Sequence, residues 1–157
     1  MNQQLFFYFI HFSEFHGNAD VIWLSTNGLA SIQRAQKDQS RGYSIKVPNQ
    51  EFAQISDFIE EAGSTSLKVN ERIAIPDEVI IKFGFRDKNR NWISIRVIEN
   101  DWHRQPSAIQ KFNTIAQRLI DMTNVLEPVH VEQFAPGKLV IQYPGEFLSN
   151  DIREALK

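Results

Sequence analysis

The chain has 157 residues, of which 42% are hydrophobic and 23% charged, and its formal net charge is −2. A chain of this length is expected to form a single globular domain, residues 1–157, that buries roughly two thirds of its unfolded surface. The slightly acidic balance disfavours a dedicated nucleic-acid-binding protein, and the lack of cysteine excludes disulfides, thiol catalysis and cysteine-ligated zinc.

The first apolar segment, residues 5–12 (LFFYFIHF), is hydrophobic on both alternating faces, which is typical of a central strand covered on both sides. It lacks the features of a signal peptide and is too short to span a membrane, so we expect a cytoplasmic protein without membrane contact. Strict alternation predicts Leu5, Phe7 and Phe9 on one face, and Phe6, Tyr8 and Ile10 on the other.

A hairpin is predicted next, because two short β-prone runs, residues 21–25 and 29–33, flank Thr26-Asn27-Gly28. A strand over residues 43–47 then ends at Pro48. The following segment, residues 49–62, has the pattern of a helix with Asn49 as its N-cap. Its apolar face consists of Phe52, Ile55, Phe58, Ile59 and Ala62.

The second half repeats the change from strand to helix patterns. Residues 67–75 predict one or two strands, and residues 78–86 and 92–99 alternate as the two arms of a hairpin. A second amphipathic helix begins at Pro106 and ends near Asn124. Its apolar positions are Ile109, Phe112, Ile115, Ala116, Leu119 and Ile120. The remaining predicted elements are strands over 129–134 and 138–143 and a short helix over 151–157, capped by Ser149.

These elements predict an α+β fold, in which a mostly antiparallel sheet of about seven to nine strands is covered on one face by two main amphipathic helices, with a short C-terminal helix in addition. The pattern Ser-Ile-basic-Val occurs at residues 44–47 and 94–97, each time before a helix. This indicates either a degenerate duplication, about 1–64 and 65–126, or an independent preference of strands for alternating residues.

Residues 11–16 (HFSEFH) place two histidines beside a carboxylate, the residue types of a metal or acid–base site. In a strand, His11 and Ser13 would face one side, and Glu14 and His16 the other. In a helix, the spacing of the two histidines departs from the three or four residues that bring side chains together. We therefore predict no metal site here and interpret the segment as a strand end.

Residues 101–104 (DWHR) precede the second helix and combine the side chains of an acid–base or anion-binding cluster. The structural alternative is that Trp102 packs under the loop, Asp101 or Gln105 caps the helix, and His103 and Arg104 stay in solvent. We favour this alternative, and the loop is also the first choice for a functional segment, because sites often lie on loops held by rigid elements.

The chain contains no Walker A, G-x-G-x-x-G, H-E-x-x-H or G-x-S-x-G pattern. Because nothing selects a nucleophile, we expect no catalytic residue, no metal and no cofactor. The leading hypothesis is a non-enzymatic protein-binding module, with nucleic acid not expected as a partner.

In size and element order the whole chain resembles small bacterial immunity proteins, which neutralise a toxin domain by direct binding. The resemblance implies a toxin as the protein partner, bound through acidic and aromatic residues. The candidate partner-binding residues are Glu60, Glu61, Asp101, Trp102, His103 and Arg104. Two alternatives remain open: a small hydrolase or nuclease that uses His16 or His103 with a carboxylate, and a homo-oligomeric structural or regulatory domain.

Overall fold

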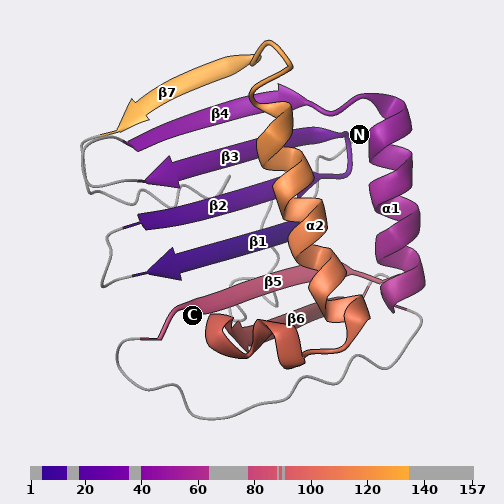
Figure 1. Cartoon of the computed structure of the whole chain (residues 1–157). Coiled ribbons are helices and arrows are strands. Elements are labelled where there is room, and N and C mark those ends of the chain that lie inside the picture. Colours follow the sequence, from indigo (N-terminus) through magenta and orange to yellow (C-terminus); the bar gives the residue numbers. More distant parts are fainter. Residues whose placement is uncertain are drawn as a thin grey trace.

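The computed structural model describes residues 5–13, 18–35, 40–63, 78–87, 89 and 91–134, and within these ranges it shows a seven-stranded antiparallel sheet (Figure 1). The strands are β1 (Leu5–Ser13), β2 (Asn18–Ser25), β3 (Leu29–Ala35), β4 (Ser40–Lys46), β5 (Ile80–Arg86), β6 (Trp92–Ile98) and β7 (His130–Phe134). Their order in the sheet is β6-β5-β1-β2-β3-β4-β7. The α+β class and the antiparallel sheet predicted from the sequence are confirmed.

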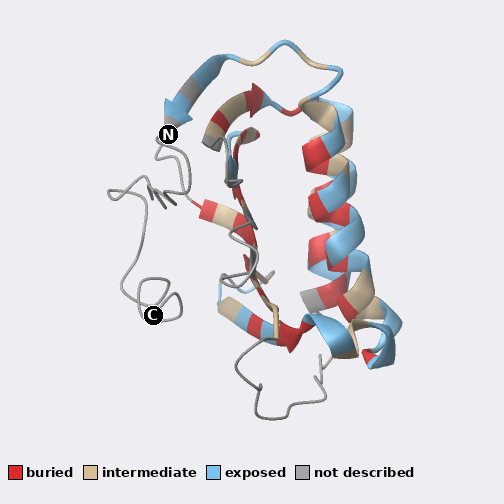
Figure 2. Ribbon diagram, turned by 60° about the vertical axis from the view of Figure 1, so that its left-hand side comes forward, coloured by how far each residue is buried: buried red, intermediate tan, exposed pale blue. Residues whose placement is uncertain are grey.

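Two main helices, α1 (Asn49–Gly63) and α2 (Ser107–Met122), lie on the same face of the sheet (Figure 2), and a short 3-10 helix, η1 (Glu99–Arg104), connects β6 to α2. Helix α2 crosses the strands, whereas α1 lies at the end of the sheet where β1 begins (Figure 1). No helix within the described ranges is long and apolar enough to cross a membrane. The strands predicted over 67–75 and 138–143 and the helix predicted over 151–157 lie outside the described residues.

Strand β1 is central, as its apolar faces predict, because it pairs with β2 on one side and β5 on the other. Phe7 and Phe9 belong to the large core beneath the helices, and Tyr8 and Ile10 belong to a smaller core on the opposite face. The register with β2 shifts between Leu5 and Phe7, as in a β-bulge. The predicted faces are therefore wrong at the strand's beginning: Leu5 lies with Tyr8, and Phe6 packs against the helix-side core.

The β2–β3 hairpin has the predicted turn. The Gly28 amide donates a hydrogen bond to the Ser25 carbonyl over 3.0 Å, and Gly28 has a φ of 82°, a conformation that glycine adopts without a Cβ clash. The Leu29 amide donates to Oδ1 of Asn27 over 3.0 Å. These contacts explain why Asn-Gly at this position fixes the reversal of the chain.

The helices confirm the predicted apolar faces, with differences at their ends. All six apolar positions predicted for α2 are buried. On α1, Ile55, Ile59 and Ala62 are buried, while Phe52 and Phe58 are half-buried.

The ends of the helices differ from the prediction. The first helical hydrogen bond of α1 runs from the Phe52 amide to the Pro48 carbonyl over 2.9 Å. Pro48 therefore holds the N-cap position predicted for Asn49, because the N-cap carbonyl accepts the first helical bond. Helix α2 ends at Met122, two residues before the predicted Asn124.

The two Ser-Ile-basic-Val segments present the same faces. Ile45, Val47, Ile95 and Val97 are buried in the helix-side core, while Lys46, Ser94 and Arg96 are exposed. A strand with helices on only one side favours this alternation wherever it occurs. A common origin of the two halves stays a prediction.

Candidate functional site

Neither α1 nor α2 lies over the end of the sheet where β1, β3 and β7 finish and where β2 and β4 begin (Figure 1). On the helix-side face, the residues change from apolar to polar toward this end. Phe7 and Phe9 of β1 are followed in alternation by His11, and Ile32 of β3 is followed by Arg34. We refer to this part of the molecule as the open end of the sheet.

A row of polar side chains crosses the open end on five neighbouring strands. Each member is the direct cross-strand partner of the next, and directly opposite residues point to the same face. The row consists of His11, Asp20, Arg34, Arg41 and Gln133, and we call it the polar row. Its members are exposed or half-buried. In the other direction, His11 pairs with the buried Ile81, where the row becomes apolar.

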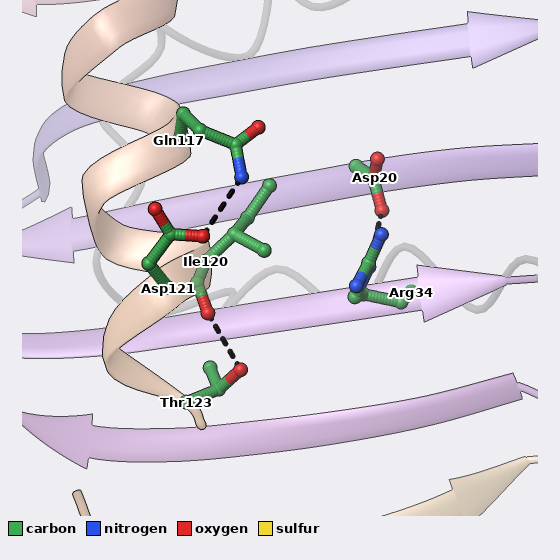
Figure 3. A network of polar contacts seen from close by, with 6 residues as sticks. All are labelled: Asp20, Arg34, Gln117, Ile120, Asp121 and Thr123. Carbon is green, nitrogen blue, oxygen red and sulfur yellow. Dashed lines mark hydrogen bonds and ion pairs between the residues drawn. The ribbon is translucent and has the colours of Figure 1, made fainter. Parts of the chain in front are cut away.

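Asp20 and Arg34 form an ion pair inside the row (Figure 3), with 2.9 Å between Oδ1 of Asp20 and Nε of Arg34. The two side chains are 24% and 42% exposed, so solvent screens the pair and limits its contribution to stability. The bond uses one of the five N–H donors of the guanidinium group. Among the described residues, Arg34 makes no other hydrogen bond or ion pair.

Arg41 lies directly opposite Arg34 in the β3–β4 ladder. Like charges in directly opposite positions repel each other and destabilise the sheet slightly. Within the part of the chain that the structure describes, no acidic side chain pairs with Arg41. The row therefore contains a guanidinium group whose charge is not balanced by a described neighbour.

His11 contacts an acidic residue that is distant in sequence. Its Nε2 lies 3.3 Å from Oε1 of Glu99 in η1, and the two side chains are 35% and 45% exposed. The sequence placed His11 beside Glu14 and His16, which lie outside the described residues. No group of three possible metal ligands occurs among the described residues. The imidazole–carboxylate contact thus depends on the packing of η1 against β1, and local spacing did not indicate it.

The flank of α2 beside the open end is also polar. Nε2 of Gln117 donates to Oδ1 of Asp121 over 2.9 Å, and the Thr123 hydroxyl donates to the Ile120 carbonyl over 2.6 Å. Figure 3 shows Gln117 and Asp121 on the side of α2 that faces the Asp20–Arg34 pair. The open end is therefore bounded by hydrogen-bonding groups from both the sheet and the helix.

Apolar side chains are exposed where the chain passes from α2 to β7. Val125, Val129 and Val131 are 84%, 67% and 47% exposed. Val131 is the cross-strand partner of Tyr43, and both share the face of the polar row, two residues from Gln133 and Arg41 respectively. Exposed apolar and charged side chains thus lie together at the β4–β7 edge.

The residues predicted as partner-binding lie on two elements, α1 and η1. Glu60 and Glu61 are exposed in the last turn of α1, and His103 and Arg104 are exposed in η1. Trp102 is half-buried against the helix-side core, with its ring edge-on to Phe83 at 6.5 Å between centroids. The packing of Trp102 and the exposure of His103 and Arg104 agree with the structural interpretation of the loop.

The predicted capping of α2 by Asp101 or Gln105 is wrong. Pro106 occupies the N-cap, and no side chain caps it; its carbonyl accepts from the amides of Ile109 and Gln110. The side chain of Gln110 instead reaches back and donates to the Gln105 carbonyl over 2.8 Å. Gln105 itself is buried, so its carbonyl needs a donor from the protein.

Comparison with protein-family models, curated proteins and solved structures gives no significant match. The class of this protein is therefore defined by its fold: an α+β domain in which two helices cover one face of a seven-stranded antiparallel sheet in the described residues. Its function must be argued from the open end and the polar row, because a fold alone does not specify one.

Proposed function

We propose that this chain is a non-enzymatic protein-binding module and that the open end of the sheet is its binding face. The observation that carries the proposal is the polar row, in which adjacent strands present side chains to one face at the end of the sheet that neither α1 nor α2 covers. Strands in a sheet lie about 4.8 Å apart, so five strands extend the row over about 19 Å. This length is closer to a protein interface than to a small-molecule site.

The chemistry of the face also supports binding to a protein. Interfaces combine apolar contacts with a hydrogen-bonding rim, and both occur here, with Val131 beside Arg41 and Gln133. The polar groups are spread along the row. An enzymatic site for hydrolysis instead needs its catalytic acid, its base and the attacking group to converge on one reacting atom.

The partner class that we propose to test first is a toxin domain, because the chain resembles bacterial immunity proteins in size and element order. Glu60, Glu61, Asp101, Trp102, His103 and Arg104 form a second candidate surface for the same function. Of the four residues that η1 contributes to this surface, His103 and Arg104 are exposed, whereas Trp102 packs inward against the core.

The test is capture of a native partner by the full chain, followed by titration of the purified pair by calorimetry. We expect stoichiometric binding that is weakened by Arg41→Glu and retained by Arg96→Glu. Arg96 is a suitable control because it is exposed on β6 and, by alternation with the buried Ile95 and Val97, points to the opposite face.

Two other outcomes would favour the alternatives. Turnover of a substrate, lost in His16→Ala or His103→Ala while the fold is retained, would support a histidine-dependent hydrolase or nuclease. A concentration-dependent mass in analytical ultracentrifugation, with no partner captured, would support a homo-oligomeric domain.

A further inference from the structure

We infer that Arg34 and Arg41 form a binding site for a carboxylate and that this site receives an acidic side chain of the partner protein. The inference rests on the proposed function and names the chemistry that the partner must supply. It starts from the register of β3 and β4, which places the two arginines directly opposite each other on the helix-side face. At such a position their Cβ atoms are about 5 Å apart, so one ligand can contact both guanidinium groups.

The hydrogen-bonding capacity of the two arginines is mostly unused within the described residues. Asp20 accepts one bond, from Nε of Arg34, and no other bond or ion pair of Arg34 or Arg41 involves a described residue. Guanidinium groups are planar forks whose paired N–H donors match the two oxygens of a carboxylate. A carboxylate between the two forks would satisfy these donors and reduce the repulsion between the arginines.

The local charge favours a single carboxylate over a polyanion. Asp20, Arg34 and Arg41 together carry one net positive charge, which one carboxylate neutralises. Glu99 beside His11 and Asp121 on the flank of α2 add negative charge around the open end, and they would repel the phosphates of a nucleic acid. The whole chain, with a net charge of −2, has no excess of positive charge to offset that repulsion.

The surroundings indicate that the carboxylate belongs to a polypeptide. Tyr43 and Val131, which is 47% exposed, form a cross-strand pair on the same face as the arginines. This pair is the neighbour, two residues along each strand, of the pair formed by Arg41 and Gln133. An acidic residue with an apolar neighbour in the partner would contact the arginines and Val131 at once. A small free acid would use only the arginines.

The first experiment measures the site without the partner. The Nε–Hε resonances of arginine in the full, ¹⁵N-labelled chain are followed during titration with a capped Val-Glu-Ala tripeptide, which carries one carboxylate, and, as a matched control, a capped Val-Gln-Ala tripeptide. We expect saturable shifts of the Arg34 and Arg41 resonances with the acidic peptide alone. Arg41→Gln should abolish the saturable response.

The control variant is Lys82→Gln/Arg96→Gln, which removes another pair of opposite positive charges, from the face away from the helices. This variant should keep the response if the effect is local to the site. Lack of saturation with the acidic peptide, an equal response of Arg96, or tighter binding of a single-stranded oligonucleotide than of the peptide would each overturn the carboxylate site.

The second experiment uses the captured partner. Arg41→Glu should weaken its affinity by about tenfold or more, and Arg96→Glu should leave it within about twofold. Unchanged thermal unfolding of both variants shows that folding is retained. If the partner binds Arg41→Glu as tightly as the original chain, the site is refuted and the proposed function stands. If no partner is captured, the proposed function fails, and the peptide titration still decides whether the site exists.

Discussion

Gly84 of β5 lies directly opposite Tyr8 of β1, and the aromatic ring of Tyr8 occupies the space that a side chain at Gly84 would need. An ideal Cβ at Gly84 would overlap Cε1 of Tyr8 and would lie 2.8 Å from Cζ2 of Trp92. The missing side chain lets the Tyr8 and Trp92 rings stack over the strand, with 5.5 Å between their centroids and 20° between their planes. Nε1 of Trp92 also donates to the Ser94 hydroxyl over 2.9 Å, which fixes the indole.

We expect Gly84→Ala to lower the free energy of unfolding by about 1–3 kcal/mol, the usual range for overpacking a filled core. The buried Tyr8 ring cannot move into solvent, and the carbonyl oxygen of Ile93, 3.0 Å from the ideal Cβ, restricts the other side. Urea unfolding monitored by tryptophan fluorescence measures the change.

Gly28→Ala is the comparison for that experiment. Its Cβ would meet the flexible end of the Lys46 side chain, so the strain comes from the backbone φ of 82°, and we expect a loss of about 1 kcal/mol. A loss for Gly84→Ala no larger than that for Gly28→Ala would contradict the packing argument.

The two phenylalanines on the helices should differ in their contributions. Phe112 is fully buried and stacks on Phe83 at 4.5 Å and on Phe85 at 5.0 Å between ring centroids. Phe112→Ala should therefore lower the free energy of unfolding by about 3–5 kcal/mol. Phe58 is half-buried and contacts Phe112 edge-on, so Phe58→Ala should lower it by less. Urea unfolding gives the free energy of unfolding of each variant from the midpoint and slope of its transition. A larger loss for Phe58→Ala than for Phe112→Ala would show that α1 packs differently.

The variant Trp102→Ala distinguishes between the two candidate binding surfaces, the open end of the sheet and η1. Because its ring packs on Phe83 and is half-buried, Trp102→Ala should lower the free energy of unfolding, by less than Phe112→Ala does. With the open end as the binding face, affinity for the captured partner should stay within about twofold. Calorimetric titration at a temperature where the variant is folded measures the affinity. A loss of about 2 kcal/mol or more, the usual size of an interface hot spot, would instead identify η1 as the binding surface.

His11 should not take part in a tight zinc site with His16. The described neighbour of its imidazole is one carboxylate, Glu99 at 3.3 Å, and zinc requires three or four ligands that converge. Calorimetric titration of the full chain with zinc should show no site tighter than about micromolar. A stoichiometric nanomolar site, lost in His11→Ala and also in His16→Ala, would refute this prediction.

Much of the fold could be predicted because the evidence for it is local. The alternation of residues 5–12 identified a strand covered on both faces. Asn27-Gly28 identified the turn between β2 and β3. Helical spacing identified all six buried positions of α2. Each pattern depends on residues close together in the chain and on the fixed periods of helices and strands. The bulge at Phe6 was missed because one extra residue reverses the alternation without any change in composition.

The sequence by itself determined most of the buried side chains and the helices and strands that carry them, and the tertiary structure alone decided which of the polar side chains meet. Nothing in the sequence connects His11, Asp20, Arg34 and Arg41. Each is a polar residue near one end of a strand, and they form a row only because β1 to β4 pair in one register. The contact of His11 with Glu99 likewise follows from where β6 and η1 lie relative to β1. Periodicity shows which face of a strand is buried, and a tight turn sets the register of its own hairpin. Backbone hydrogen bonds are nearly the same for every residue type except proline, so the pairing of strands that are distant in sequence, such as β1 with β5 and β4 with β7, comes from the packing of the whole domain.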